Sequence, residues 1–243
     1  MLNVKGKWVL ITGASRGIGY YTAVFMASMG ANLILHARNK ANLEKVINDV
    51  KEYNVEIRTV TAELSEILSV KEMLKEIDAM NLQVDIVLNN AGLQVTYRND
   101  YYVTPPEDYE LSFRINTIAP MMICYHFLPK MIENGFGRIV NTSSGIMNEP
   151  QQGPYSASKA ALDKVTKDLA TTVEGTDVMI NLADPGWCRT DLGGESAPNS
   201  PESTIPGICL GAFLDDGKSG RWISAQDYSG MTIEEAVKKA SAK

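Results

Sequence analysis

Short apolar runs alternate with longer stretches of helical periodicity along most of the chain. The first run, Trp8–Ile11, ends in Thr12-Gly13 and is typical of a buried strand followed by a turn. A helical stripe follows from Gly17 to Met29, and Gly30 then supplies a helix stop. Strands separated by helices of this length pair as parallel neighbours through crossover connections. The sequence therefore predicts an α/β fold, a doubly wound, Rossmann-like parallel sheet with helices on both faces.

The alternation continues almost to the end of the chain and predicts about seven strands. We expect one dinucleotide-binding catalytic domain over residues 1–243, because no linker rich in Gly, Pro or Ser divides it. A capping-box pattern at Ser69–Glu72 predicts that a helix begins there. Segment 193–207 is predicted to be a substrate-side loop that acts as a lid, and 232–243 a C-terminal tail containing a short polar helix. The later strands are expected at 33–35, 55–60, 84–88, 138–141, 178–182 and 221–223, and the later long helices at 108–133 and 155–174.

Charge and composition exclude several classes of protein. The chain of 243 residues has 23 basic and 29 acidic side chains, whereas binders of nucleic acid or membrane surfaces have an excess of Lys and Arg. No apolar run reaches the roughly 18 residues of a membrane span, and no signal-peptide core is present. Three cysteines without a CxxC pair, and two distant histidines, do not suggest a metal site. We therefore expect a cytoplasmic protein with no metal, nucleic-acid or membrane partner.

A glycine-rich turn, TGASRGIG at residues 12–19, joins the first strand to the first helix. Gly13, Gly17 and Gly19 allow a sharp turn and a close approach of the backbone to a ligand. The N-terminus of the following helix offers free N–H groups and a positive dipole to a pyrophosphate. The alternative is a tight connection that binds nothing. The position between a predicted strand and a predicted helix favours a dinucleotide site.

The end of the second strand indicates which dinucleotide is bound. A free ribose 2′-hydroxyl is usually held by Asp or Glu at this position, but the sequence is His36-Ala37-Arg38-Asn39. Arg38 offers a planar fork to a 2′-phosphate, and Arg16 in the glycine turn can approach the same phosphate. The alternative for Arg38 is an ordinary solvated loop residue. We therefore predict NADP(H) in preference to NAD(H).

Tyr155 and Lys159 lie four residues apart on a predicted helix, so their side chains share one face. An unperturbed phenol, with a pKa of about 10, is a poor acid–base group near neutrality. A nearby ammonium is expected to lower that pKa. Taken alone, such a pair is more often a surface contact than a catalytic one.

Two further groups of residues favour the catalytic interpretation of the Tyr155–Lys159 pair. Asn141-Thr142-Ser143-Ser144 ends a predicted strand, where a doubly wound sheet presents ligand-binding groups, although simple strand-end capping is the alternative. Asn116 precedes Pro120 by four residues inside a helix, so its carbonyl loses the usual N–H partner. A kink there is either purely structural or the seat of an ordered water.

These motifs together resemble the short-chain dehydrogenase/reductase family. TGxxxGIG at 12–19, the NNAG at 89–92, Asn116, Ser144, YxxxK at 155–159 and Pro185-Gly186 occur in the family's order and approximate spacing, and the resemblance extends from about Lys5 to Ile223. It implies that Tyr155 is the general acid–base and that Lys159 lowers its pKa and holds the nicotinamide ribose. It also implies that Ser144 orients the substrate and that Asn116 completes a water-linked proton relay.

The resemblance also implies a set of cofactor-binding positions: Gly13, Ser15, Arg16, Gly17, Ile18, Gly19, Arg38, Glu63, Leu64, Asn90, Ala91, Gly92, Tyr155, Lys159, Pro185, Gly186 and Thr190. Glu63 stands where the family usually has Asp. The segment from Ser144 to Tyr155 is two residues shorter than is common, which leaves Ser143 as an alternative to Ser144.

The implied activity is reversible hydride transfer between NADP(H) and a ketone or aldehyde and its alcohol. The C-terminal part resembles the carbonyl-reductase branch, and Gln94, Met147 and Trp187 are expected to contact a small carbonyl or alcohol substrate. Relatives pair through helices near 108–133 and 155–174, so we expect a homodimer or homotetramer. The alternative is a non-catalytic dinucleotide-binding sensor or scaffold, which would be expected to have lost some of the four catalytic residue types.

Overall fold

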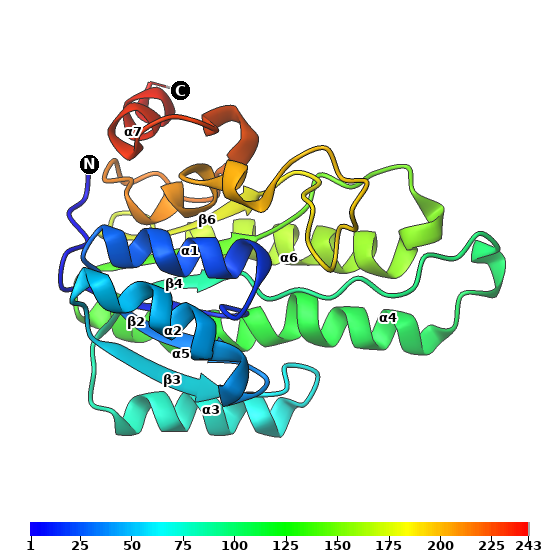
Figure 1. The fold of residues 1–243 in the computed structure, drawn as a ribbon, viewed down its shortest axis with the longest axis horizontal. Coiled ribbons are helices and arrows are strands. Elements are labelled where there is room, and N and C mark those ends of the chain that lie inside the picture. Colours follow the sequence, from blue (N-terminus) through cyan, green and yellow to red (C-terminus); the bar gives the residue numbers. More distant parts are fainter. Residues whose placement is uncertain (243) are drawn as a thin grey trace.

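The computed structural model describes residues 1–242, and these form a sheet of seven parallel strands in the order β3-β2-β1-β4-β5-β6-β7 (Figure 1). This architecture confirms the predicted α/β, doubly wound fold. Each apolar run seen in the sequence is a strand, and most extend one or two residues beyond the expected ends. The strands are β1 (Trp8–Ile11), β2 (Asn32–Ala37), β3 (Ile57–Thr61), β4 (Val84–Asn89), β5 (Gly137–Thr142), β6 (Val178–Asp184) and β7 (Trp222–Ser224).

Helices connect the strands and cover both faces of the sheet (Figure 1). In the described part of the chain, no helix is both long and apolar enough to cross a bilayer. The α-helices are α1 (Gly17–Ser28), α2 (Glu44–Val50), α3 (Ile67–Ala79), α4 (Pro106–Phe113), α5 (Ala119–Glu133), α6 (Gly153–Thr171) and α7 (Ile233–Ser241). Shorter turns are η1 (Lys40–Leu43), η2 (Lys51–Tyr53), η3 (Tyr101–Val103), the π-helical η4 (Arg114–Ile118), η5 (Pro150–Gln152), η6 (Pro201–Thr204), η7 (Gly207–Ala212) and η8 (Ala225–Tyr228).

The continuous apolar character of the strands follows from burial on both faces. Side chains alternate along a strand, so Val9 and Ile11 of β1 pack with α1, α2 and α7, whereas Trp8 and Leu10 pack with α3, α5 and α6. β1 lies between β2 and β4, with Leu10 opposite Ile34 on one side and Val87 on the other. The chain reverses its direction of winding between β1 and β4, and a doubly wound sheet binds ligands beyond the carboxyl ends of its strands at such a point.

Two helix predictions need correction. Helix α3 begins at Ile67, and the Ser69 hydroxyl accepts a hydrogen bond from the backbone N–H of Glu63 at 2.9 Å, so Ser69–Glu72 is not a capping box. The long helix expected over 108–133 is interrupted, because the π-helical turn η4 separates α4 from α5.

A complete capping box does occur in the C-terminal tail. The Thr232 hydroxyl accepts from the N–H of Glu235, and the Glu235 carboxylate accepts from the N–H of Thr232 at 2.9 Å. Two backbone N–H groups at the N-terminus of α7 are thereby satisfied, which stabilises this short helix. Lys243, the last residue of the predicted tail, lies outside the described residues.

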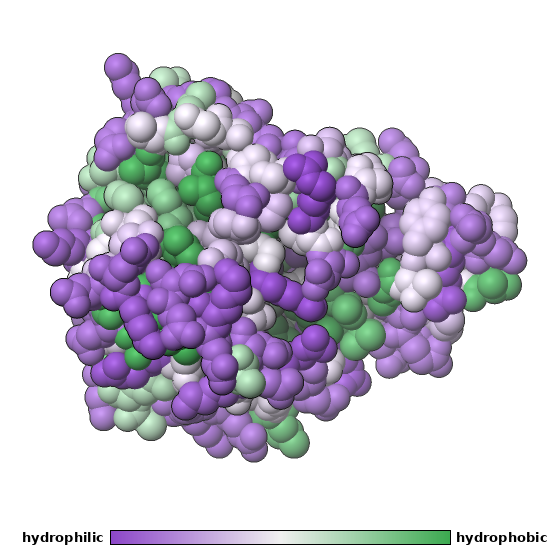
Figure 2. Space-filling view, in the orientation of Figure 1, coloured by the Kyte–Doolittle hydropathy of each residue, from purple (hydrophilic) through white to green (hydrophobic). Residues whose placement is uncertain are grey.

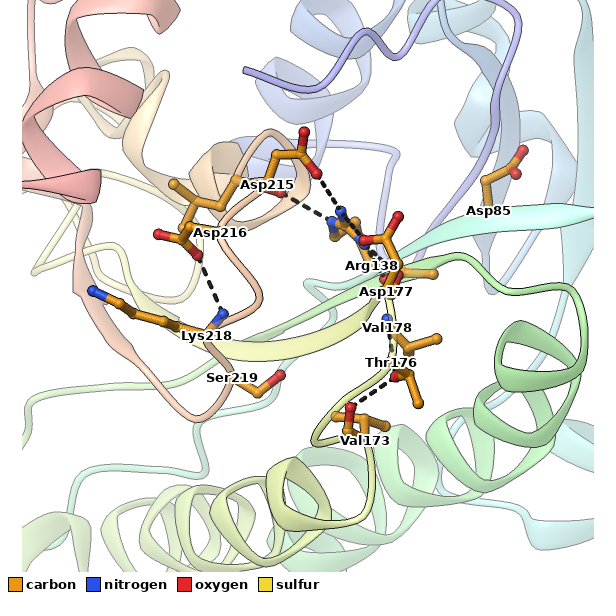
Figure 3. Close-up of polar contacts among 12 residues, drawn as sticks. Asp85, Arg138, Val173, Thr176, Asp177, Val178, Asp215, Asp216, Lys218 and Ser219 are labelled. Atoms are coloured by element: carbon orange, nitrogen blue, oxygen red, sulfur yellow. Dashed lines mark hydrogen bonds and ion pairs between the residues drawn. The ribbon is translucent and has the colours of Figure 1, made fainter.

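A fully buried arginine joins three segments at the amino ends of the strands. Figure 3 shows Arg138, at the start of β5, between Asp177, which precedes β6, and Asp215, which follows η7. The guanidinium donates to the carboxylates of Asp177 at 2.7 Å and Asp215 at 3.3 Å, and to the backbone carbonyls of Leu214 and Asp177. Such a group is tolerated inside a protein only when its N–H donors are satisfied in this way.

Candidate functional site

The glycine turn packs so closely against neighbouring backbone that side chains are excluded at two of its positions. Gly13 has φ +67°, and a Cβ built there would lie 3.0 Å from the Cα of Ala91. A Cβ on Gly19 would lie 2.1 Å from the carbonyl oxygen of Gly13, so a larger residue requires the turn to move. Arg16, the residue before α1, is extended and provides no side-chain cap. The first N–H groups of α1 are therefore left for a ligand.

Neighbouring strands hold this turn in place. The Asn90 amide, after β4, donates to the carbonyl oxygens of Thr12 at 3.2 Å and Gly13 at 3.4 Å. The N–H of Gly13 donates to Nδ1 of buried His36, whose other ring nitrogen lies 3.2 Å from the Ala62 carbonyl. Burial lowers the pKa of His36, so the ring is neutral and accepts at Nδ1. No sequence motif indicated this role for His36.

A cavity of about 750 Å³ lies beyond the carboxyl ends of the strands, alongside the glycine turn. Figure 2 shows the corresponding face of the molecule hollowed near its centre and bordered by hydrophilic residues. This volume is within the range of small-molecule and cofactor sites, roughly 300–1,000 Å³. Of the predicted cofactor residues, those that line the cavity are Gly13, Ser15, Arg16, Gly17, Ile18, Arg38, Glu63, Leu64, Asn90, Ala91, Gly92, Tyr155, Lys159, Pro185 and Thr190. Gly19 and Gly186 are not among the lining residues.

The two arginines predicted for a 2′-phosphate differ in their surroundings. Both line the cavity, but Arg16 is ion-paired with Asp191, in the loop after β6, at 2.6 Å. Arg38 has neither an ion pair nor a hydrogen bond within residues 1–242. The lining also includes residues of α1, η1 and α2 that sequence reasoning missed, namely Tyr20, Tyr21, Asn42 and Lys45. No sequence motif marks them, because they reach the cavity only through the packing of α1 on α2.

Tyr155 lies in the first turn of α6, buried, with its phenol oxygen hydrogen-bonded to Ser144. Burial raises the pKa of Tyr155, the nearby negative charge of Asp184 adds to the rise, and the Ser144 hydrogen bond opposes it. The pKa of Tyr155 is therefore raised, whereas the Tyr155–Lys159 spacing predicted a lowered value. The Lys159 ammonium lies 5.9 Å from the centre of the Tyr155 ring, and desolvation of the phenol is the largest influence on its pKa.

Lys159 is fully enclosed one turn further along α6. Its ammonium donates to the carbonyl oxygen of Thr142, at the end of β5, at 2.7 Å. Burial lowers the pKa of Lys159 to about 8, although the carboxylates of Asp163 and Asp184 act in the opposite direction. A lysine with this pKa exchanges a proton readily near neutral pH.

Asn116 lies within η4, where the Asn116–Pro120 spacing predicted a disturbed helix. Its side-chain oxygen accepts from the N–H of Leu93 at 2.8 Å, and its amide donates to the Leu93 carbonyl at 2.7 Å and to Ser158 at 3.0 Å. A Cβ on Gly92 would lie 3.5 Å from both Asn116 Oδ1 and Lys159 Nζ. Asn116 thus fixes the segment after β4 beside Lys159, and Gly92 leaves the space between them open.

The two serines at the end of β5 face different partners. Ser144 contacts Tyr155, whereas the Ser143 hydroxyl donates to the carboxylate of Asp163 on α6. Burial raises the pKa of Asp163, and its negative charge is one of those that favour the ammonium form of Lys159. Ser143 and Asp163 together tie β5 to α6 beneath the Tyr155–Lys159 pair. This link joins residues 20 positions apart, and spacing alone does not reveal it.

The residues expected to contact substrate lie outside the cavity as described. Gln94 is half-buried, while the side chains of Met147 and Trp187 are 70% and 57% exposed. The loop predicted as a lid is also internally bonded. Cys188 and Asn199 pair as an isolated β-bridge, and Arg189 donates to the carbonyls of Ala197 and Pro198, so segment 187–199 is braced against itself.

Comparison with known proteins assigns the chain to a family. The family model for short chain dehydrogenases matches residues 7–201, which span the glycine turn, the Tyr155–Lys159 pair and the loop after β6. The chain belongs to the short-chain dehydrogenase/reductase family. It is therefore an oxidoreductase of a family that binds a nicotinamide dinucleotide.

Individual relatives differ in length and in what their names describe. The chain is 31% identical to the 3-oxoacyl-[acyl-carrier-protein] reductase FabG of Rickettsia conorii over 216 residues, covering 88% of this chain and 86% of the relative. It is 30% identical to a short chain dehydrogenase of Pseudocercospora fijiensis over 195 residues, 78% of this chain but only 62% of that relative. A short chain dehydrogenase from Shigella flexneri, complexed with NADP, superposes with a TM-score of 0.83 at 25% identity, covering 93% of this chain and 100% of that one.

Proposed function

We propose that this protein is an NADP(H)-dependent carbonyl reductase that interconverts a ketone or aldehyde and its alcohol. The observation that carries the proposal is the hydrogen-bonded pair Ser144–Tyr155 with Lys159 beside it, of which Tyr155 and Lys159 line a cleft of cofactor size. The proposal rests on these three side chains, because the fold alone hosts many different reactions.

The cleft fits a 2′-phosphorylated dinucleotide. The uncapped N-terminus of α1 and the close-packed glycines at 13 and 19 suit a pyrophosphate, and unpaired Arg38 at the end of β2 suits the 2′-phosphate. The relative complexed with NADP supports the same choice. When bound, the nicotinamide supplies or accepts the hydride.

The protein's own residues handle the proton. Because burial raises its pKa, the Tyr155 phenol is protonated at neutral pH and is ready to protonate a carbonyl oxygen. Ser144, bonded to the same phenol, orients that oxygen by a second hydrogen bond. Lys159, with a pKa of about 8, returns a proton to the tyrosine, and Asn116 holds the neighbouring backbone in place. In the oxidative direction each proton moves the opposite way.

Tyr155→Phe tests the proposal directly. We expect NADPH oxidation with a panel of ketones and aldehydes, followed by absorbance, to fall by at least about a thousandfold, which is within the range attributed to general acid–base catalysis. NADPH binding should stay within about twofold, because the lost hydroxyl bonds to Ser144. Ser144→Ala is expected to lower the turnover number more than Ser143→Ala, its matched control. Retained ketone reduction in Tyr155→Phe would refute the mechanism, and tight NADPH binding with no turnover in the wild type would indicate a sensor.

We further propose that the chain acts as a homodimer or homotetramer that associates through the helical regions 108–133 and 155–174. Ile118, Tyr125 and Ile132 recur at seven-residue intervals and are exposed, at 39%, 58% and 40%. An exposed apolar row of this kind commonly marks an interface. Light scattering after size exclusion is expected to show a smaller species for Tyr125→Lys than for the wild type, whereas Tyr102→Lys, on η3, serves as a control. A monomeric wild-type protein would refute the proposal.

A further inference from the structure

Two of the residues that line the cavity form an ion pair with each other. Arg16, which immediately precedes α1, and Asp191, in the loop after β6, both line the cavity, and Nη1 lies 2.6 Å from Oδ2. The two segments also touch next to this pair, since a Cβ on Gly17 would lie 3.1 Å from the Thr190 methyl group. The carboxylate of Asp191 is thus paired with the cation that the glycine turn itself contributes to the cavity lining.

We propose that Asp191 is a positioning residue that holds Arg16 away from the ribose 2′-phosphate and so reduces the preference for NADP(H) over NAD(H). The inference rests on the proposed cofactor. A 2′-phosphate entering the cleft meets Arg38 unpaired, but meets Arg16 already neutralised by a carboxylate. It must either draw Arg16 from Asp191 or lie near an uncompensated negative charge. A dinucleotide without the 2′-phosphate faces neither requirement.

The expected effect of Asp191 on NADP(H) binding is small because the ion pair is exposed to solvent. The side chains of Arg16 and Asp191 are 65% and 69% exposed, so water screens both the ion pair and the repulsion. Exposed pairs of this kind are weak, and removal of Asp191 should tighten NADP⁺ binding by about threefold at low salt. Raising the salt concentration should shrink the difference, since both contributions are screened charge interactions.

Isothermal titration with NADP⁺ and NAD⁺ tests the inference, because the two ligands differ only in the 2′-phosphate. Asp191→Asn is expected to lower the Kd for NADP⁺ about threefold and to leave that for NAD⁺ within about 1.5-fold. The matched control is Glu195→Gln, which removes an exposed carboxylate from the same loop. Glu195 does not line the cavity and has no ion pair within residues 1–242, so both Kd values should stay unchanged.

A double-mutant cycle separates this role from a structural one. If Asp191 acts through Arg16, Arg16→Gln should weaken NADP⁺ binding more in the Asp191→Asn background than in the wild type. Equal changes in the Kd values for NADP⁺ and NAD⁺ would show instead that the Arg16–Asp191 ion pair only holds the loop against α1, and would overturn the inference. Unchanged Kd values in Asp191→Asn would overturn it as well. A wild-type protein that binds neither dinucleotide would instead overturn the proposed function itself, together with this inference.

Discussion

Replacing Lys159 by methionine should make the folded protein more stable while abolishing its proposed chemistry. Lys159 is fully buried, and burial lowers its pKa from the ordinary 10.5 to about 8. Each pKa unit corresponds to about 1.4 kcal/mol, so keeping the ammonium charged inside the protein costs about 3 kcal/mol below pH 8. Methionine has a similar length and no charge. It loses the hydrogen bond to the Thr142 carbonyl, which offsets about 1 kcal/mol of the gain.

The net gain is therefore about 2 kcal/mol at pH 7, which corresponds to a melting temperature about 4–8 °C higher for a chain of this size. The gain depends on pH in a defined direction. The folded-state pKa lies below the unfolded one, so between pH 8 and 10.5 the unfolded chain binds more protons and the wild type becomes more stable as pH rises. At pH 9.5 the buried Lys159 of the wild type is mostly neutral, and the destabilisation that it causes has fallen to about 1 kcal/mol. The lost hydrogen bond then offsets this gain, so the variant and the wild type should be nearly equal in stability.

Thermal melts followed by circular dichroism at pH 7 and pH 9.5 measure both effects. Lys164→Met is the matched control, because Lys164 is exposed on the same helix and pairs with Asp168 at the surface. Its free energy of unfolding should change by less than about 0.5 kcal/mol at either pH. A Lys159→Met protein that melts below the wild type at pH 7, or whose advantage grows toward pH 9.5, would refute the reasoning.

Three further changes test other parts of the molecule. Arg138→Met leaves the carbonyl oxygens of Leu214 and Asp177 without their donor, so urea unfolding should show a loss of about 2–4 kcal/mol; a loss below about 1 kcal/mol would contradict this role. Gly19→Ala places a methyl group against the glycine turn, and NADPH binding by titration should weaken at least about tenfold; unchanged affinity would show that the turn relaxes freely. Arg38→Asp should raise the KM for NADPH far more than that for NADH, and equal effects on both would remove the support for a 2′-phosphate site.

Much of the fold was predictable because local patterns and global topology agree. Each strand is buried on both faces, so apolar runs such as Trp8–Ile11 stand out, and parallel crossovers follow from the helices between them. The Tyr155–Lys159 spacing also placed both side chains on one face of α6. One local pattern misled, because the Ser69 hydroxyl accepts a hydrogen bond from Glu63, outside the helix. The Asn116–Pro120 spacing indicated a disturbed helix, but it did not specify that the disturbance is a π-helical turn.

Most of the predicted cofactor residues line one cavity, but the electrostatics of the site were not predictable from the sequence. Residue spacing reveals only which pairs of side chains lie close together, and the Tyr155–Lys159 pair alone suggested a lowered phenol pKa. Desolvation depends on everything packed around the group, and it reverses the sign. The partners of Ser143 and Arg16 were likewise hidden, because Asp163 and Asp191 come from distant segments that only the folded chain brings together.

The π-helical turn η4 also sets the rotational phase between two helices. α4 packs against α6, with Ser112 fully buried, whereas α5 packs against the sheet. One residue of α-helix corresponds to a rotation of about 100°, so deleting a single residue from η4 would turn the buried face of α4 away from α6 by that angle. The same deletion would displace Asn116 from Leu93. A length change at this one turn would therefore disturb a helix interface and the neighbourhood of Lys159 together, which makes η4 a segment where substitutions are tolerated more easily than insertions or deletions.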